Sequence, residues 1–324
     1  ELARAGGINK EIAESIYHWE KNWSLAEEWE KIRALGLNVI DCKDPLYPPR
    51  LAEIYDPPLV LYYKGDLDAA RRRAIAVVGS RHATSYGFET ARKLSYQCAY
   101  AGLTVVSGLA QGIDTAGHQG ALAAKGKTVA VFGSSLDKVY PAENQTLAEK
   151  IVENGGAILS EFRLGTPPDR YTFPMRNRIV SGLSEGVLVI EAGKTSGAMI
   201  TAHMAGEQGR QVFAVPGRID NPRVSGCHAL IKDGAKLVEN VDDIFAEFSL
   251  LFPKTEMQPS LSLPNNLSAE EKKVVEAIDN DEIGLDEIIR KCGLPSAVVS
   301  SSLLRLELKR LVRRLPGKCF IRIN

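Results

Sequence analysis

The chain has 324 residues, more than one ordinary hydrophobic core supports, so we expect one large domain with smaller domains attached. Its 40 Lys and Arg residues balance its 40 Asp and Glu residues, so bulk charge gives no sign of a nucleic-acid partner and any basic site must be local. Five widely spaced cysteines without a CxxC pair argue against a disulfide framework and against a zinc site.

No apolar run approaches the roughly 18 residues that span a bilayer, and the first residues lack the basic and then apolar order of a secretory signal. The sequence therefore predicts a soluble, cytoplasmic protein without membrane contact.

Residues 1–64 predict a small helical module at the start of the chain. Short helical segments come first, and prolines then interrupt the chain within residues 45–49 and 57–58. Proline cannot continue a helix, because it lacks the amide hydrogen and its ring clashes with the preceding turn. We place the start of the next domain at residue 65.

Residues 65–250 predict a Rossmann-like α/β domain, doubly wound around a mostly parallel sheet. Apolar, β-branched runs alternate with segments of helical periodicity. Strands that are apolar throughout are typical of parallel sheets covered by helices on both faces. The candidate strands are residues 74–78, 104–106, 128–132, 157–159, 187–190 and 211–215.

Residues 251–267 predict a linker, and residues 268–324 predict a second domain. The linker is rich in Pro, Ser and Asn and has no apolar period. Three helices and two strands around a Pro-Gly turn are expected after it, which is the composition of a winged helix. The candidate helices are residues 268–279, 284–291 and 295–309, and the candidate strands are residues 311–315 and 318–323.

Three of the predicted strands in the larger domain end in glycine-bearing turns, at Gly79, Gly108 and Gly133. Ligands bind beyond the carboxyl ends of the strands in an open parallel sheet. Small residues at these turns let a phosphate approach the backbone closely. The three turns together predict one phosphate-binding crevice.

The first of these turns, residues 79–84, carries Ser80, Arg81 and Thr84. A dinucleotide-binding turn has a third glycine where Arg81 stands, and it requires an acidic residue after the second strand to hold a ribose, which is missing here. No cofactor is therefore expected. Arg81 could form a surface salt bridge, but its position at a strand end favours a phosphate contact.

A second group of cations lies at Arg176 and Arg178, with Asn177 between them. Guanidinium groups match phosphate oxygens with two parallel hydrogen bonds, so both arginines are candidate phosphate contacts. The alternative is that one of them pairs with Glu161 or Glu185 and locks the fold. The sequence does not decide which arginine has which role.

A helix N-terminus is expected at Ser196 and Gly197, just after the strand at residues 187–190, where it offers a further anion site. Lys194 beside it is either a ligand contact or a solvated surface lysine. Arg170 is a further candidate contact.

Three aromatic residues, Tyr140, Tyr171 and Phe173, are candidate stacking faces for unpaired bases. Phe173 precedes a proline and an apolar run, so it is expected to lie in the core.

The sequence contains no recognisable catalytic motif and no metal-ligand spacing among its histidines. Asp114 and His118 lie one turn apart at a predicted helix start, which is a possible acid and base pair. The interpretation that we favour is structural, with Asp114 as a cap and His118 as a packed or hydrogen-bonded residue. We therefore expect no enzyme activity.

Several long segments resemble the DprA/Smf family of DNA-processing proteins, in the order in which that family has them. They are SGLAQGID (residues 107–114), VFGSSLDKVYPAEN (131–144), FPMRNRIVSGLS (173–184), EAGKTSGAMITA (191–202) and VFAVPG (212–217). The resemblance covers residues 40 to 245.

The resemblance implies a Rossmann-like core that binds single-stranded DNA, forms a homodimer and helps to load a RecA-type recombinase in natural transformation. The phosphate pocket of the family would fall on residues 79–81, on Gly108, on the turn at Gly133 and on residues 176–178. His228 departs from the family, which usually has Asn at this position. The hydrogen bonding of the turn expected at residues 225–226 is therefore in doubt.

The winged helix occurs in part of this family, and it could contact duplex DNA. Five basic residues gather near its wing: Arg305, Lys309, Arg310, Arg313 and Arg314. The first three of them could equally form the solvated face of a helix.

Two other functions remain open. Phosphoribohydrolases of the lysine-decarboxylase-like group have a similar sheet, but residues 191–202 lack their double glycine and trailing Glu. A purely structural adaptor would have little reason to gather arginines at strand ends.

Overall fold

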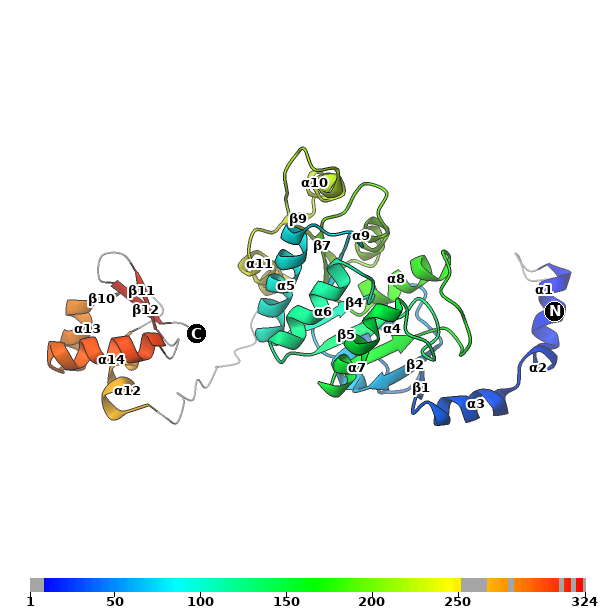
Figure 1. Cartoon of the computed structure of the whole chain (residues 1–324), viewed down its shortest axis with the longest axis horizontal. Helices are drawn as coiled ribbons and strands as arrows, with labels where there is room; N and C mark the ends of the chain where they lie inside the picture. The colour runs from blue at the N-terminus through cyan, green and yellow to red at the C-terminus, as the bar shows by residue number, and fades with distance from the viewer. Residues whose placement is uncertain (1–8, 252–266, 279–282, 309–311, 316–318, 323–324) are drawn as a thin grey trace. The chain divides into compact units, whose positions relative to one another are not determined.

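The structure is a computed structural model that describes residues 9–251, 267–278, 283–308, 312–315 and 319–322. The chain divides into two compact units, residues 1–253 and residues 254–324, and each is described by itself. Figure 1 shows the helices and strands of both units.

A nine-stranded sheet forms the centre of the first unit. The seven strands from β6 to β9 run parallel, whereas β2 pairs antiparallel with both β1 and β6. Across the sheet the order is β1 (Asn38–Asp41), β2 (Val60–Gly65), β6 (Ala157–Ser160), β5 (Thr128–Val131), β4 (Thr104–Ser107), β3 (Ala74–Gly79), β7 (Gly186–Ile190), β8 (Gln211–Ala214) and β9 (Lys236–Leu237).

Helices cover both faces of this sheet, because its central strands are apolar on both sides. Ala76 and Val78 of β3 pack with one group of helices, and Ile75 and Val77 pack with the other. The first group is α4 (Pro49–Ala52), α8 (Thr172–Gly182), α9 (Gly197–Glu207) and α10 (Ser225–Lys232). The second group is α5 (Ser85–Tyr100), α6 (Ile113–Ala123) and α11 (Val241–Leu251). This is the doubly wound α/β fold that the sequence predicts.

All six strands predicted in the larger domain are present, but β1, β2 and β9 were not predicted. β2 follows prolines 57 and 58 and crosses the boundary that the sequence placed at residue 64. Its register with β6 pairs Tyr62 with Ser160 and Gly65 with Ala157. The leading residues therefore contribute strands to the main sheet.

The helices before β1 are α1 (Lys10–Tyr17), α2 (Trp19–Asn22) and α3 (Leu25–Ala34). One buried carboxylate joins α3 to the sheet: Glu28 accepts hydrogen bonds from the Tyr62 hydroxyl at 3.1 Å and from the Leu164 amide at 2.9 Å. Ile32 of α3 packs into the same region beside α7 (Gln145–Glu153).

The second unit has its own hydrophobic core, with three helices and a small sheet. They are α12 (Ala269–Glu276), α13 (Leu285–Cys292), α14 (Ser296–Leu308), β10 (Ile283–Gly284), β11 (Val312–Leu315) and β12 (Cys319–Arg322), with the strand order β10-β12-β11. The predicted winged helix is confirmed, and β10 adds a third strand. Most of the predicted linker lies outside the described residues, as do Lys309 and Arg310, and the side chains of Arg313 and Arg314.

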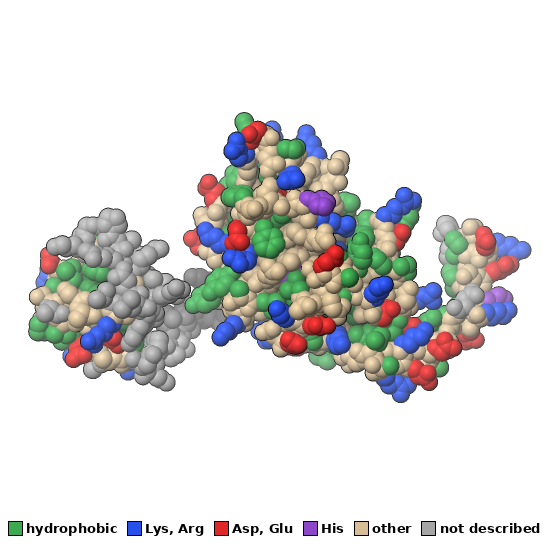
Figure 2. All heavy atoms as spheres, viewed as in Figure 1, with side chains coloured by type: hydrophobic (Ala, Val, Ile, Leu, Met, Phe, Trp, Pro, Cys, Tyr) green, Lys and Arg blue, Asp and Glu red, His purple; other side chains and the backbone are tan. Residues whose placement is uncertain are grey.

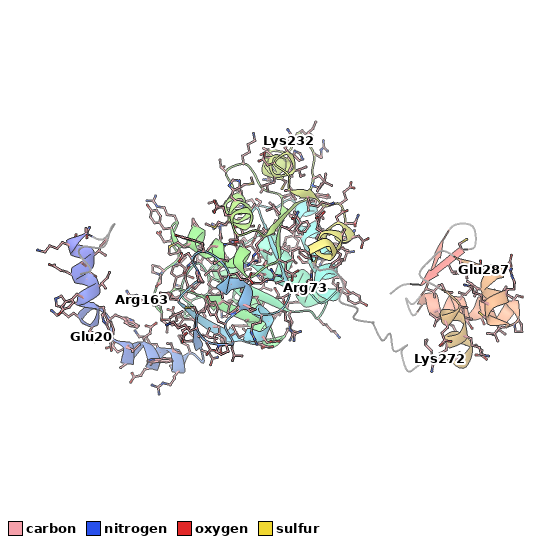
Figure 3. The ribbon with its side chains drawn as sticks, turned by 180° about the vertical axis from the view of Figure 1, so that it is seen from behind. Glu20, Arg73, Arg163, Lys232, Lys272 and Glu287 are labelled. Carbon is pink, nitrogen blue, oxygen red and sulfur yellow. The ribbon has the colours of Figure 1, made fainter. Side chains whose placement is uncertain are left out.

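Acidic and basic side chains are interspersed over the face of the first unit seen in Figure 2, in agreement with the balanced composition. Arg73, labelled in Figure 3, has a half-exposed side chain and donates two hydrogen bonds of 2.8 Å to the buried carboxylate of Glu185. Within the described part of the chain, no helix has the length and apolar character needed to cross a bilayer.

Candidate nucleic-acid interface

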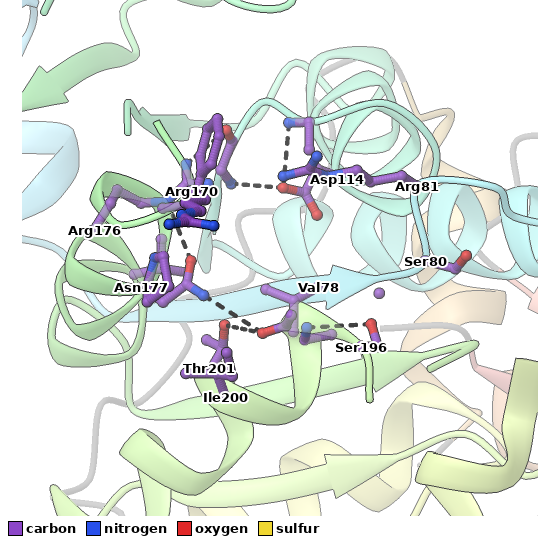
Figure 4. Close-up of a pocket in the computed structure, with 18 of the residues that line it drawn as sticks. Val78, Ser80, Arg81, Asp114, Arg170, Arg176, Asn177, Ser196, Ile200 and Thr201 are labelled. Atoms are coloured by element: carbon purple, nitrogen blue, oxygen red, sulfur yellow. Dashed lines mark hydrogen bonds between the residues drawn. The ribbon is translucent and has the colours of Figure 1, made fainter. Parts of the chain in front are cut away.

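A cavity of about 630 Å³ lies at the carboxyl ends of β3 and β4, between α8 and the start of α9 (Figure 4). We call it the strand-end cavity. It brings together most of the predicted contact residues, which come from five separate stretches of the chain. They are Gly79, Ser80, Arg81, Gly108, Arg170, Arg176, Asn177, Ser196 and Gly197.

Two exposed cations line this cavity, Arg81 and Arg170. The Arg81 guanidinium lies over the ring of Phe173, 5.0 Å from the centroid, and it makes no ion pair with any described residue. Phe173, which we expected in the core, is instead half-buried and lines the cavity. The aromatic ring therefore holds an unneutralised guanidinium at the cavity.

Arg176 has a different environment, because its guanidinium is buried beneath the turn at Gly108. Nη1 donates to the Gly108 carbonyl at 2.6 Å and also to the Val131 carbonyl. Burial lowers the pKa of Arg176 to about 10, against the opposing effect of the Asp114 carboxylate and with a smaller contribution from the charge of Arg81. The group stays protonated at neutral pH, so it supplies positive charge from below the cavity.

Asp114 occupies the backbone amides of the second glycine turn. Its Oδ2 accepts hydrogen bonds from the Gly108 amide at 3.1 Å and from the Ala110 amide at 3.3 Å. Burial raises the pKa of this carboxyl, while Arg176 and the two amides act in the opposite direction. We expected phosphate to approach the backbone at Gly108, but the Gly108 amide already donates its hydrogen bond to the Asp114 carboxylate.

His118, one turn further along α6, has the structural role that we favoured. It is fully buried, and its Nδ1 lies 2.7 Å from the Thr128 hydroxyl oxygen. Burial lowers the pKa of this imidazole to about 3, so it is neutral at physiological pH.

The start of α9 forms another wall of the strand-end cavity. Ser196 caps the helix by accepting a hydrogen bond from the Ala198 amide at 3.3 Å. Asn177 lies beside it and donates to the Gly197 carbonyl at 3.4 Å. The partial positive charge of this helix end adds to the charge of the two arginines.

Arg178 does not line the cavity, and its pairing answers the question that the sequence left open. Its guanidinium makes hydrogen bonds of 2.7 and 2.6 Å with Glu161 and one of 3.2 Å with Asp56. Glu185, the other carboxylate considered, pairs with Arg50 and Arg73. Arg178 thus locks the fold, and we leave it out of the proposed site.

Three further candidates also lie outside the lining. Gly133 packs under Phe173, where an added Cβ would come within 2.6 Å of the ring. Thr84 contacts the Glu191 carboxylate through its amide and its hydroxyl. Lys194 is exposed to solvent.

An adjoining cavity of about 430 Å³ shares Arg81, Phe173 and Arg176 with the strand-end cavity. It adds Lys138, which our sequence reasoning missed, although Lys138 lies in the same loop as the Gly133 turn. It also adds Tyr140, whose ring centroid is 5.8 Å from that of Phe173.

His228, the departure from the family pattern, lies within α10 and not in a turn, so the expected turn at residues 225–226 is wrong. Its side chain contacts the loop after β8. Its Nε2 lies 3.0 Å from the Gly217 carbonyl oxygen and 3.3 Å from the Gly217 amide nitrogen.

Comparison with known families decides the identity of the chain. The family model described as DNA recombination-mediator protein A matches residues 38–249, which include the whole strand-end cavity. The chain belongs to this family. A second model, described as the DprA winged helix domain, matches residues 258–318.

Curated relatives support membership of the DNA recombination-mediator protein A family. The chain is 46% identical over 224 residues to the DNA processing protein DprA of Streptococcus pneumoniae, covering 69% of this chain and 77% of that protein. It is 39% identical over 284 residues to Protein Smf of Escherichia coli, covering 86% of this chain and 76% of that protein.

Solved structures agree with this family membership. The X-ray structure of DprA from Streptococcus pneumoniae has a TM-score of 0.67 at 42% identity, covering 75% of this chain and 83% of that one. The structure of DNA processing protein A from Helicobacter pylori, whose description concerns its mode of binding single-stranded DNA, has a TM-score of 0.59 at 28% identity. It covers 65% of this chain and 95% of that one.

Proposed function

We propose that this chain binds single-stranded DNA in the strand-end cavity without strong sequence preference. The observation that carries the proposal is Arg81, an exposed guanidinium without an ion-pair partner among the described residues, held over Phe173 at the carboxyl ends of the parallel strands. Phosphate is the group that best complements a guanidinium in this setting.

Charge and shape support a path for the strand. The DNA phosphates would lie over Arg81 and the start of α9, and the buried charge of Arg176 would attract them from below. A base would stack on the ring of Tyr140 in the adjoining cavity, where stacking is worth about 1–3 kcal/mol per base. The relative from Helicobacter pylori, described as binding single-stranded DNA, adds support from the family.

We further propose that the chain works as a homodimer that loads a RecA-type recombinase onto incoming DNA, with the winged helix as a candidate contact for duplex DNA. Membership of a family described as recombination mediators supports this role. The hydrolase alternative is not favoured, because the relatives at 39% and 46% identity are DNA-processing and Smf proteins.

Fluorescence anisotropy across a salt series tests the binding proposal. Labelled oligo-dT and a duplex of equal length are titrated with the wild type, with Arg81→Ala and with the control Arg92→Ala. Arg92 is an exposed arginine on α5 outside the strand-end cavity. Each phosphate contact contributes about −0.7 to the slope of log affinity against log salt for a single strand.

We expect salt-sensitive preference for the single strand in the wild type and in Arg92→Ala. Arg81→Ala should weaken binding to all sequences alike, by about tenfold or more, and should flatten the salt slope. Equal binding to the duplex, or an Arg81→Ala variant that changes sequence preference and keeps the slope, would overturn the phosphate assignment.

A further inference from the structure

Another cavity, of about 650 Å³, lies at the carboxyl ends of β3, β7 and β8. We call it the Glu191 cavity. The chain leaves β3 toward β4 on one side and returns through β7 on the other, so this region is the switch point of the sheet, where ligands of such folds bind. Its lining residues are Thr84, Tyr86, Glu191, Gly217, Arg218, Asn221 and Val224.

Glu191 is held in this cavity by unusual local structure. Its side chain is buried, yet its backbone has a φ of 50°, a conformation that residues other than glycine rarely adopt. Gly87 makes room for it, since a Cβ at Gly87 would overlap the carboxyl group. Such strain in a cavity is typical of a functional position.

The Glu191 carboxylate retains capacity to accept hydrogen bonds. Oε2 accepts from the Thr84 amide at 2.7 Å, and Oε1 accepts from the Thr84 hydroxyl. A carboxylate has about four acceptor positions, so each oxygen keeps one. Among the described residues, no Lys, Arg or His forms an ion pair with Glu191, and buried charges normally have such partners.

We propose that the Glu191 cavity binds a guanine base. Guanine has two adjacent donors, N1–H and the N2 amino group, which match the remaining acceptor on each carboxylate oxygen. Adenine and cytosine place an acceptor beside their amino group, and thymine has a single N–H between two carbonyls. The exposed ring of Tyr86 offers a stacking face, and Val224 and Gly217 make the lining suitable for a planar base.

The guanine could belong to the bound strand or to a free nucleotide. In the first case the inference rests on the proposed function, because residues 80–81 line the strand-end cavity and Thr84 lines the Glu191 cavity. A strand in the first cavity can therefore place a neighbouring base in the second. The experiment needs one arm for each source.

The first arm measures anisotropy with a fifteen-nucleotide oligo-dT, with the same oligonucleotide carrying one central dG, and with deoxyinosine in place of that dG. Inosine lacks the N2 amino group. Wild type should bind the dG oligonucleotide about tenfold more tightly than oligo-dT, with inosine close to oligo-dT. Glu191→Gln should lose the preference and keep its affinity for oligo-dT.

Tyr86→Ala gives a second variant that does not depend on the buried carboxylate, because Tyr86 is exposed. It should reduce the dG preference, whereas Tyr100→Ala, an exposed tyrosine elsewhere on α5, should preserve it. The second arm measures binding of dGMP by calorimetry to the same proteins. If the wild type binds dGMP, Glu191→Gln does not, and the first arm shows no dG preference, the ligand is the free nucleotide.

Absence of both a dG preference and dGMP binding would overturn the inference. These outcomes are independent of the proposed function, because unchanged binding of oligo-dT keeps the strand-end cavity as the DNA site even if the Glu191 cavity binds nothing. If the wild type does not bind oligo-dT at all, the proposed function is contradicted. The dGMP measurement then remains as the test of the Glu191 cavity.

Discussion

The guanidinium of Arg81 and the ring of Phe173 form a cation–π contact, with 5.0 Å between the guanidinium carbon and the ring centroid. Gly133 supports the ring from beneath, because any side chain there would collide with it. The third glycine turn thus contributes to the site by supporting Phe173, whose ring lies beneath the Arg81 guanidinium.

Replacing Phe173 by Leu should weaken binding of oligo-dT about twofold to fivefold. Leucine fills part of the volume but removes a cation–π contact worth about 0.5–1 kcal/mol. Anisotropy at fixed salt measures the change. Phe173→Tyr keeps the aromatic face and should bind nearly as the wild type does, and equal weakening in both variants would contradict the role of the ring.

Replacing Asp114 by Asn should strengthen binding of single-stranded DNA severalfold at low salt. Asn keeps an oxygen acceptor for the Gly108 and Ala110 amides, but it removes a negative charge beside the DNA phosphates. The gain should fade as salt rises, because salt screens the charge. Glu207→Gln, which removes an exposed carboxylate outside the cavity, is the matched control. No change in affinity at low salt would show that Asp114 does not act on the bound strand.

Replacing Arg178 by Ala should destabilise the fold by about 3 kcal/mol, because Glu161 would be left with little solvent and no cation. Urea unfolding measures the loss. The double variant Arg178→Met with Glu161→Leu should recover much of it, since no unpaired charge remains. The folded Arg178→Ala protein should bind oligo-dT with the wild-type salt slope, and a flatter slope would return Arg178 to the DNA site.

His118 should make the protein sensitive to acid. Its pKa is about 3 in the folded chain and about 6.5 when unfolded, so the unfolded state takes up a proton that the folded state does not. Its stabilising contribution is present above about pH 6.5 and is lost as the pH falls toward 3.

Between pH 7 and pH 5, this difference should remove about 2 kcal/mol of the free energy of unfolding. Urea unfolding of His118→Gln should show a correspondingly smaller loss over the same interval. His203→Gln, at an exposed histidine, should keep the wild-type dependence. Equal pH dependence in all three proteins would mean that folding does not lower the pKa of His118.

Much of the fold follows from the sequence because the parallel strands are apolar runs between helical segments, a pattern that few other folds produce. β1 and β2 could not be predicted in the same way, because prolines separate them from each other and they pair antiparallel, without the intervening helix of a parallel crossover. Residues of these strands such as Leu61 are buried by tertiary packing. No local propensity of the sequence specifies that burial.

The sequence predicted most of the residues that line the strand-end cavity, but not the surroundings of each side chain. Strand-end glycines indicate where a ligand can approach, yet Asp114 already occupies the amides of one turn. Arg176 and Arg178 are two residues apart and the same residue type, so only the fold shows that one is buried beneath Gly108 and the other pairs with Glu161. The role of each arginine depends on partners from distant segments of the chain, and the sequence does not show which residues those partners are.

Arg178 has a consequence for how this protein can be divided. It joins α8, a wall of the strand-end cavity, to Asp56 in the proline-rich segment, by which we mean residues 44–58. Arg210, just after α9, similarly pairs with Glu53 of this segment. A fragment that begins after residue 59 would keep every cavity-lining residue and lose both attachments. We therefore expect this segment to stabilise the walls of the cavity, and we expect a DNA-binding fragment to need it.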